Sequence, residues 1–376
     1  MTKYVLAPDS FKESMTAKEV CEAMEKGILK ADPTAEIVKV PMADGGEGTV
    51  DSLVDATHGK RVYLNVKGPL NQEVQAYYGI LGDKKTAIIE MAKASGLELL
   101  TPNLRNPAKA TTYGTGQLIK DALDQGMKRI IIGLGGSSTN DGGAGMAQAL
   151  GAYLLDEKGN ELTPGGGQLN KLAKIDISEL DPRLQSTQII LASDVTNPLT
   201  GKNGASYVFG KQKGANASLI EQLDQNLSHY AHIIKRDLGK DIENLPGAGA
   251  AGGLGAGLMA FTNTQMEKGI DLVIKLTHLE EKIRQADYVF TGEGGTDFQT
   301  KFGKAPYGVA QLAQRYQKPV FSLAGYLGDG IEDLYQYGFT AFFGILAQAS
   351  SLEEALKNGP QNVERTTENI VRTLMC

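Results

Sequence analysis

The feature that most constrains the fold is a unit of apolar strand, polar loop and helix that recurs near both ends of the chain. In its clearest copy a polar loop at 9–14 follows the strand, and Thr16 with Glu19 form a capping box that predicts a helix start. The predicted strands of such units lie at 4–8, 37–40, 287–290, 320–324 and 341–345. Because strands that alternate with helices form parallel sheets, the sequence predicts an open α/β sheet with its functional loops along one edge.

Between these regions the pattern changes. Residues 62–66 and 74–80 alternate apolar and polar side chains around a Gly-Pro turn, which is typical of an antiparallel hairpin. Buried strands are expected at 129–134 and 188–192, and helices at 116–125 and 218–238. We therefore expect one discontinuous α/β domain, residues 1–66 plus 284–376, and an inserted α/β domain, residues 67–283, with antiparallel strands and glycine-rich loops.

Glycine is in excess and clustered. The chain has 46 glycines among 376 residues, about 12 per cent against a usual 7 per cent or so. Four loops combine glycine with acidic and hydroxyl side chains: 9–14, 44–49, 133–145 and 291–308. Such loops bind phosphate through backbone N–H groups and helix N-termini, and their carboxylates indicate a bridging divalent cation, magnesium. This combination is what phosphoryl transfer requires, although any single loop is as often a simple turn.

Three side chains stand out individually. Lys12 lies in the first strand-to-helix loop, and Lys304 precedes Pro306 at a predicted helix start, where a positive charge is unfavourable unless an anion binds there. Asp194 follows the strand at 188–192 and has the chemistry of a general base toward a substrate hydroxyl. Each also has an ordinary interpretation, as solvated surface lysines and as an Asx turn.

Several function classes are disfavoured. The net charge of −6 argues against nucleic acid or an anionic membrane as the main partner. Only Cys21 and Cys376 carry thiols, which favours a reducing cytoplasmic location without a disulfide framework. We expect no secretory leader, since charged residues interrupt the apolar N-terminal segment, and no membrane span, since the uncharged run 247–261 is shorter than the roughly 20 residues a bilayer needs.

Two nucleotide-binding motifs are rejected. No Walker A sequence occurs, because Lys304 is followed by Ala305. The pattern G-x-G-x-x-G does occur at 247–252, but the polar residues before it cannot form the strand that a dinucleotide site requires. The glycines that continue this run serve either close helix packing or backbone approach to a ligand.

Long sequence strings carry a family resemblance. They are APDSFKES (7–14), PMADGGEGT (41–49), IIIGLGGSSTNDGGAGM (130–146), SDVTNPL (193–199), GAGAAGGLGAGL (247–258) and TGEGGTDFQTKFGKAPYGVA (291–310). In this order the chain closely resembles the bacterial type I glycerate kinases over nearly its whole length. The resemblance implies ATP-dependent phosphorylation of D-glycerate, to 2-phosphoglycerate rather than 3-phosphoglycerate, with magnesium. It also implies a flavodoxin-like domain with a large inserted mixed α/β domain and an active site in the inter-domain cleft.

The resemblance and the loop chemistry together give an expected role to each candidate residue. Asp194 and Lys12 are the predicted catalytic residues. The predicted substrate-binding residues are Asp9, Ser10, Asp44, Gly136, Ser137, Ser138, Asn140 and Asp141. The predicted nucleotide-binding residues are Gly45, Gly46, Gly252, Gly253, Gly292, Gly294 and Lys304, and the predicted magnesium ligands are Glu293 and Asp297.

One position departs from the family pattern. Family members commonly read TGEGRxD, whereas this chain has Gly295-Thr296 before Asp297. A positive charge that could contact phosphate is therefore absent, and Lys301 or Lys304 is the candidate replacement. Two other functions stay open as alternatives: an NAD-dependent hydroxy-acid oxidoreductase, which predicts saturable NADH binding, and a non-catalytic hydroxy-acid sensor, which predicts ligand binding without ADP release.

Overall fold

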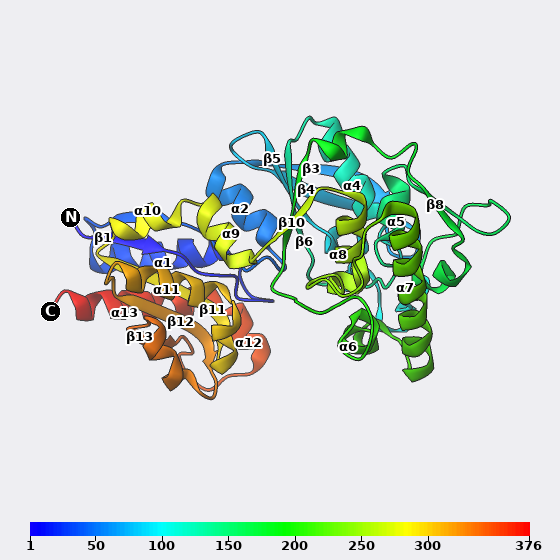
Figure 1. Cartoon of the computed structure of the whole chain (residues 1–376). Helices are drawn as coiled ribbons and strands as arrows, with labels where there is room; N and C mark the ends of the chain where they lie inside the picture. Colours follow the sequence, from blue (N-terminus) through cyan, green and yellow to red (C-terminus); the bar gives the residue numbers. More distant parts are fainter. The chain divides into compact units, whose positions relative to one another are not determined.

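The computed structural model describes residues 1–376, and contacts between residues divide the chain into two units (Figure 1). Unit 1 comprises Met1–Asp44, Asp51–His58 and Lys268–Cys376, and unit 2 comprises Gly45–Val50 and Gly59–Glu267. The predicted domain boundaries at residues 66 and 284 fall inside strand β3 and at the end of helix α10, and they stay a prediction. No helix has the length and apolar character needed to cross a membrane.

Unit 1 is built on a five-stranded parallel sheet. Its strands are β1 (Lys3–Leu6), β2 (Glu36–Lys39), β11 (Tyr288–Thr296), β12 (Val320–Leu327) and β13 (Ala341–Gly344). Their spatial order is β2-β1-β11-β12-β13, which is the flavodoxin-like order 2-1-3-4-5 when the strands of unit 1 are numbered alone. Successive strands are added on one side of β1 and then, from β11 onward, on its other side, and ligands of such sheets bind beyond the carboxyl ends of the strands at this switch point.

Helices flank this sheet. They are α1 (Ala17–Ala31), α2 (Thr49–Thr57, which begins in unit 2), α9 (Gly269–Leu276), α10 (Leu279–Arg284), α11 (Ala305–Arg315), α12 (Leu352–Lys357) and α13 (Gly359–Leu374). The Thr16–Glu19 capping box at the start of α1 is confirmed. Helices α1 and α13 pack together so closely that a Cβ on Gly27 would lie 2.3 Å from Glu364 O. Their apolar faces share one buried cluster with Leu6 and Phe290 of the sheet.

The predicted glycine loop after residue 290 is wrong in its first part. Strand β11 continues to Thr296, because its glycines pair in parallel register with β12, with Gly292 opposite Leu323 and Gly295 opposite Tyr326. The irregular segment is therefore shorter, and a 3₁₀ helix at Phe298–Phe302 occupies much of it. The final predicted helix from about residue 352 is likewise two helices, α12 and α13, separated by Asn358.

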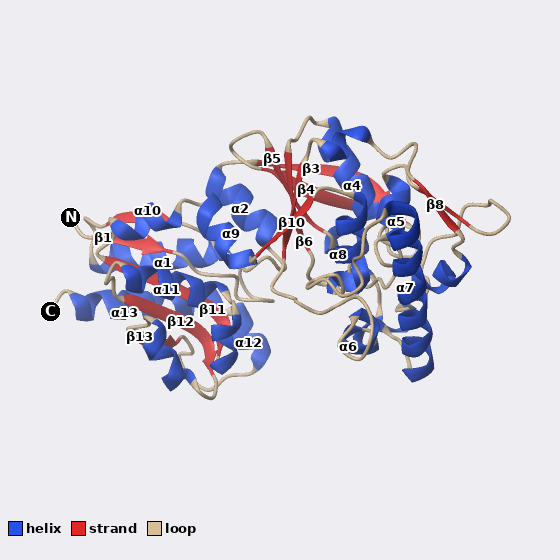
Figure 2. Ribbon diagram, in the orientation of Figure 1, coloured by secondary structure: helices blue, strands red, loops and turns tan.

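Unit 2 contains a six-stranded mixed sheet (Figure 2). Its order is β10-β9-β6-β5-β4-β3. The strands are β3 (Lys60–Lys67), β4 (Glu73–Ile80), β5 (Thr86–Glu90), β6 (Arg129–Gly133), β9 (Gln188–Ala192) and β10 (Thr264–Glu267). Strands β3, β4 and β5 are antiparallel, as the predicted hairpin requires, whereas β5, β6, β9 and β10 are parallel. The loops that follow β5, β6 and β9 therefore leave the same edge of the sheet.

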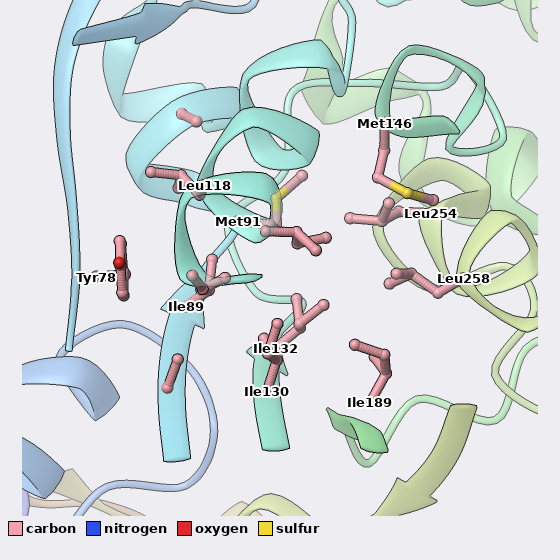
Figure 3. Close-up of a cluster of buried hydrophobic side chains, with 14 of the residues drawn as sticks. Tyr78, Ile89, Met91, Leu118, Ile130, Ile132, Met146, Ile189, Leu254 and Leu258 are labelled. Carbon is pink, nitrogen blue, oxygen red and sulfur yellow. The ribbon is translucent and has the colours of Figure 1, made fainter. Parts of the chain in front are cut away.

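The remaining elements of unit 2 are helical except for a small antiparallel pair, β7 (Tyr153–Leu155) and β8 (Lys174–Asp176). The helices are α3 (Ala92–Ser95), α4 (Tyr113–Asp124), α5 (Ala144–Ala149), α6 (Ala205–Phe209), α7 (Ala217–Leu238) and α8 (Ala250–Phe261). The core lies between the sheet and α4, α5 and α8. In Figure 3, Ile132 and Ile189 from the strands lie toward Leu254 and Leu258 of α8, Ile89 lies beside Leu118 of α4, and all are fully buried. Each such side chain contributes about 1.5–3 kcal/mol through burial.

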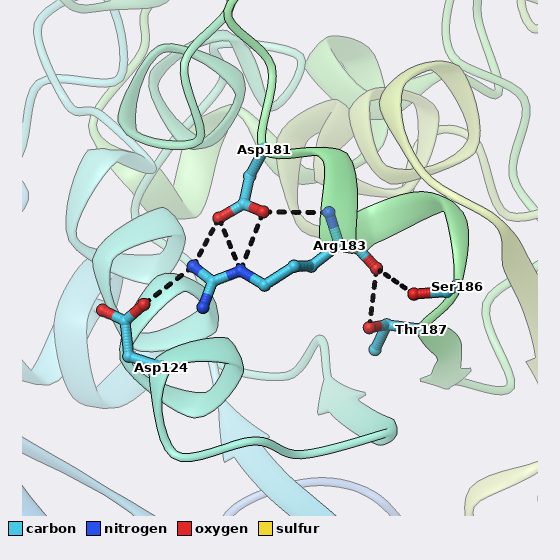
Figure 4. A network of polar contacts seen from close by, with 5 residues as sticks. All are labelled: Asp124, Asp181, Arg183, Ser186 and Thr187. Carbon is cyan, nitrogen blue, oxygen red and sulfur yellow. Dashed lines mark hydrogen bonds and ion pairs between the residues drawn. The ribbon is translucent and has the colours of Figure 1, made fainter.

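A polar network fixes the segment that leads into β9 (Figure 4). Arg183 Nη2 donates to Asp181 Oδ2 at 2.6 Å and to Asp124 Oδ1, at the end of α4, at 2.7 Å. The Arg183 carbonyl in turn accepts from Thr187 Oγ1 at 2.9 Å. Since the arginine side chain is 42% exposed, its ion pairs contribute little to stability, and the network mainly orients the chain.

Candidate active site

Three carboxylates gather near the carboxyl ends of neighbouring strands in unit 1. Asp9 follows β1, Asp44 follows β2, and Glu293 lies in β11. The Asp9 N–H donates to Gly292 O at 2.9 Å, so the loop after β1 continues alongside β11. Burial raises the pKa of Asp9 to about 8, with further contributions from the negative charges of Asp44 and Glu293. Asp9 is therefore mostly protonated at neutral pH, and this cluster occupies the switch point of the sheet.

Lys304 is paired with one of these carboxylates. Its Nζ donates to Glu293 Oε2 at 2.8 Å and to Gly295 O at 3.1 Å. Thr300 Oγ1 and Thr296 Oγ1 donate to Glu293 Oε1 at 2.6 and 3.2 Å. Burial raises the pKa of Glu293 although Lys304 and both hydroxyls favour its ionised form. Lys304 is the N-cap of α11, as predicted, and its charge is balanced by a protein carboxylate.

The carboxylate chemistry of unit 1 fits magnesium. No group of three or more His, Cys, Asp and Glu side chains is arranged to hold a metal ion, but magnesium commonly takes only one or two carboxylates together with substrate phosphates and water. Asp297 Oδ1 accepts from Gln299 N at 2.8 Å. Both carboxylate oxygens of Glu293 are already hydrogen-bonded. The repulsion that raises the Asp9 pKa is what a bound divalent cation would relieve.

The loop that carries Ser10 and Lys12 approaches β11 at Gly294. A Cβ on Gly294 would lie 3.5 Å from Lys12 N, an ordinary contact, whereas a Cβ on Gly292 would lie 2.3 Å from Leu323 O. Sheet packing thus explains Gly292, while Gly294 leaves the backbone accessible beside the loop. The Lys12 side chain is exposed and forms no ion pair in the structure. It is the cation of this loop that is available to an external anion.

In unit 2 the loop 133–145 is organised by Asp141. This carboxylate is fully buried and accepts from Thr112 N at 2.8 Å, Thr112 Oγ1 at 2.9 Å, Gly143 N at 3.2 Å and Gly145 N at 3.3 Å. Burial raises the pKa of Asp141, against these hydrogen bonds, which favour the ionised form. The neighbouring Asn140 is also buried and bonds Ser206 Oγ at 3.0 Å. Asp141 therefore bonds the loop to itself and to Thr112, and Asn140 bonds it to α6.

The exposed part of this loop is Gly135 and Gly136, whereas Ser137 and Ser138, which follow, are buried. Gly136 is exposed and has φ +72°, a conformation that favours glycine. Ser138 donates from both N and Oγ to Ser95 O, at 3.0 and 2.9 Å, so its hydroxyl is committed to the fold. Ser137 differs, because its Oγ accepts a hydrogen bond from Lys213 Nζ at 2.7 Å.

Lys213 is the principal residue that the sequence did not reveal. It ends a 3₁₀ helix at Lys211–Lys213, is only 2% exposed, and also donates to Thr139 O at 2.7 Å. Burial lowers its pKa to about 7, and the charge of Asp141 opposes this effect. Lys213 is one of two lysines around a glutamine between two glycines, and no local pattern marks which of the two is buried. Only the flanking glycines could have drawn attention to the turn.

Other predicted residues of unit 2 have packing roles. Gly45 and Gly46 lie against the end of β6, where a Cβ on Gly133 would lie 2.8 Å from Gly45 O. Gly252 and Gly253 have φ of +69° and +88° inside α8. A Cβ on Gly252 would lie 1.9 Å from Thr139 O. Close packing against the loop 133–145 therefore accounts for Gly252 and Gly253, and nucleotide binding by Gly45, Gly46, Gly252 and Gly253 stays a prediction.

Asp194 lies just after β9 and is exposed. The turn around it is set by Ser193, whose Oγ accepts from Val195 N at 3.2 Å.

The predicted site residues are divided between the two units. Unit 1 holds Asp9, Ser10, Lys12, Asp44, Gly292, Glu293, Gly294, Asp297 and Lys304, and unit 2 holds Gly45, Gly46, Gly136, Ser137, Ser138, Asn140, Asp141, Asp194, Gly252 and Gly253.

Known proteins resemble the chain over its full length. The sequence pattern of the Glycerate kinase family matches residues 4–375. A glycerate kinase of Halalkalibacterium halodurans is 51% identical over 370 residues, 98% of this chain and 97% of that protein. A glycerate 2-kinase of Escherichia coli is 52% identical over 372 residues, 99% of this chain and 98% of that protein. A crystal structure from Salmonella typhimurium, of a candidate glycerate kinase 2, is 51% identical and superposes with a TM-score of 0.91, covering 100% of this chain and 98% of that one.

Proposed function

The chain belongs to the glycerate kinase family, and from that premise we propose that it transfers the γ-phosphoryl group of ATP to the 2-hydroxyl group of D-glycerate. The products are 2-phosphoglycerate and ADP. The observation that carries this proposal is the 52% identity to a glycerate 2-kinase across 99% of the chain. The carboxylates and lysines at the switch point of unit 1 support it, because phosphoryl transfer depends on charge placed around phosphate.

In the proposed reaction, oxygen 2 of glycerate attacks the γ-phosphorus, the bond from that phosphorus to the bridging oxygen of ADP breaks, and Asp194 accepts the proton of the attacking hydroxyl. Asp194 suits this role because it is exposed at the end of a parallel strand. Lys12 supplies positive charge to the anionic substrates, since it is exposed and unpaired in the structure. Ser137 and the backbone of Gly136 bind the glycerate carboxylate.

Glu293 and Asp297 would hold magnesium, which when bound neutralises negative charge on the nucleotide phosphates. Because Lys304 already bonds Glu293, that lysine favours the ionised form of the carboxylate and holds it in place. We also propose a cytoplasmic location, which suits two cysteines that form no disulfide.

Phosphorus NMR of the product tests the function. The enzyme is incubated with ATP, magnesium and D-glycerate, and the new phosphate ester is compared with authentic 2- and 3-phosphoglycerate. We expect the 2-isomer only, and conversion by added enolase without a mutase confirms it. The 3-isomer would refute the regiochemistry, and no ester at all would refute the activity.

Two variants test the proposed roles. Asp194→Asn and Lys12→Ala should each lower kcat by about 10²-fold or more, while the unfolding midpoint stays that of the wild type, because both side chains are exposed. Lys18→Ala, an exposed lysine on the outer surface of α1, is the matched control for loss of a charge. Wild-type turnover in either test variant contradicts the role of that residue.

A further inference from the structure

A buried lysine without an ion-pair partner, Lys213, lies beside the exposed Gly135 and Gly136 at the start of the loop 133–145. Lys213 is 2% exposed, and the two oxygens that it bonds, Ser137 Oγ and Thr139 O, are both neutral. The structure gives it no ion pair. The carboxylate of Asp141 acts on it electrostatically, but that carboxylate is bonded to four donors of its own surroundings. Burying an ammonium group without a paired anion is unfavourable, so the burial of Lys213 requires a reason other than stability of the fold.

The backbone fixes Lys213 in this position. Lys213 N donates to Gly210 O at 3.1 Å, and Ala215 N donates to the same oxygen, also at 3.1 Å. Gly214 closes the turn with φ +95°, and a Cβ there would lie 2.6 Å from Arg105 O. Lys211, on the same 3₁₀ turn, is exposed. The turn therefore directs one of its two lysines into the protein.

The contact with Ser137 determines what that hydroxyl can do. In its ammonium form Lys213 has only donors, so in that form Ser137 Oγ is the acceptor in this bond. The hydroxyl hydrogen of Ser137 is then left to bond a different acceptor, and the structure provides none within the protein. Gly136, which precedes it, is exposed. The site thus has an unused donor, polarised by a cation behind it, next to accessible backbone.

We propose that Lys213 is a positioning residue of the substrate site, which orients the Ser137 hydroxyl and lends positive charge so that this hydroxyl binds the carboxylate of the hydroxy acid. This inference rests on the proposed function. The depressed pKa of Lys213 agrees with it, because a bound anion would favour the ammonium form. Asp141 is the one titratable group that acts on Lys213 in the free protein. Binding of the acid near neutral pH should therefore take up protons at Lys213.

Lys213→Met tests the inference, because methionine keeps the length of the side chain and removes its charge. We expect KM for D-glycerate to rise about 10- to 100-fold, as for loss of a charge-assisted hydrogen bond, with KM for ATP changed less than about two-fold. Unfolding should not occur at lower temperature, since a buried charge is replaced by an apolar group. Lys211→Met is the matched control and should behave as wild type, because that side chain is exposed.

A double-mutant cycle with Ser137→Ala separates positioning from general support of the loop. If Lys213 acts through Ser137, adding Lys213→Met to Ser137→Ala should raise KM for D-glycerate by much less than it does in the wild type. Equal effects in both backgrounds would overturn the inference. Calorimetry of D-glycerate binding in two buffers of different ionisation enthalpy should detect proton uptake in the wild type and less in Lys213→Met, and unchanged uptake in the variant would also overturn it.

Each failure has its own signature. Absence of phosphoryl transfer in the wild type refutes the proposed function before any variant is made. A folded Lys213→Met with wild-type KM for D-glycerate refutes only the role of Lys213. If Lys213→Met does not fold, Ser137→Ala decides, because a wild-type KM for D-glycerate in that variant would show that the Ser137 hydroxyl does not bind the substrate.

Discussion

Replacing Asp9 by asparagine should stabilise the protein, and the gain should grow with pH. Asp9 has its pKa raised from an ordinary 3.8 to about 8 by burial and by Asp44 and Glu293. The unfolded chain releases this proton near pH 4 and the folded chain near pH 8, so folding becomes less favourable as pH rises between these values. At 1.36 kcal/mol per unit the limit is about 6 kcal/mol. Because the side chain is partly exposed, solvent screening reduces this to about 2 kcal/mol.

Urea unfolding of the wild type and Asp9→Asn at about pH 5 and about pH 8 measures the effect. Asparagine keeps an Oδ1 to accept from Ser10 N, which the structure records at 2.6 Å, so the local turn is preserved. The variant should gain on the order of 1 kcal/mol more at the higher pH, because part of the roughly 2 kcal/mol is already present at about pH 5. Asp44→Asn should reduce the pH dependence of the wild type, and Asp333→Asn, an exposed carboxylate of unit 1, is the control. An equal gain at both pH values would refute the reasoning.

Two further predictions concern glycines. Gly295→Arg should lower KM for ATP by restoring a positive charge, but a Cβ there would lie 2.2 Å from Tyr326 Cε1, so the effect should be larger when Tyr326→Ala is added. An unchanged KM in the double variant removes the idea. Gly252→Ala should cost several kcal/mol of stability, because its φ is +69° and its Cβ would lie 1.9 Å from Thr139 O. Gly239 has nearly the same φ, +70°, but a Cβ there would meet nothing within 4 Å, so Gly239→Ala should cost only about 1 kcal/mol. Equal urea unfolding midpoints for Gly252→Ala and Gly239→Ala would show that the contact with Thr139 O is unimportant.

Local patterns were sufficient for most of the fold because they report on short-range physics. The capping box at Thr16 places the start of α1, and strict alternation predicts the β3–β4 hairpin. The extension of β11 to Thr296 could not be predicted in this way. Its residues are glycines and polar side chains, and they become a strand only because β12 offers hydrogen-bonding partners from a segment about thirty residues away.

The residues of the candidate site likewise fall into those that local sequence patterns predict and those that depend on tertiary contacts. Asp9, Asp44 and Glu293 could be singled out because each belongs to a loop or strand end with a recognisable composition, and parallel strands bring such ends together. The internal role of Asp141 could not, because two of its four hydrogen bonds come from Thr112, in a different segment. Lys213 could not either, since burial is decided by tertiary packing.

Asp9 and Lys213 have pKa values shifted to about 8 and about 7 by the same physical cause, burial. The two shifts indicate ligands of opposite charge. In each case burial opposes the charged form, and no opposite charge at bonding distance offsets it. The charges acting on Asp9 are carboxylates, so a cation would restore its ionised form. The oxygens bonded to Lys213 are neutral, so an anion would restore its protonated form. Since a ligand that favours the charged state of a buried group must also stabilise the folded chain, each of these residues links binding to stability. That linkage is expected at a functional site, where perturbed pKa values are most often found, and is hard to explain for residues selected for stability alone.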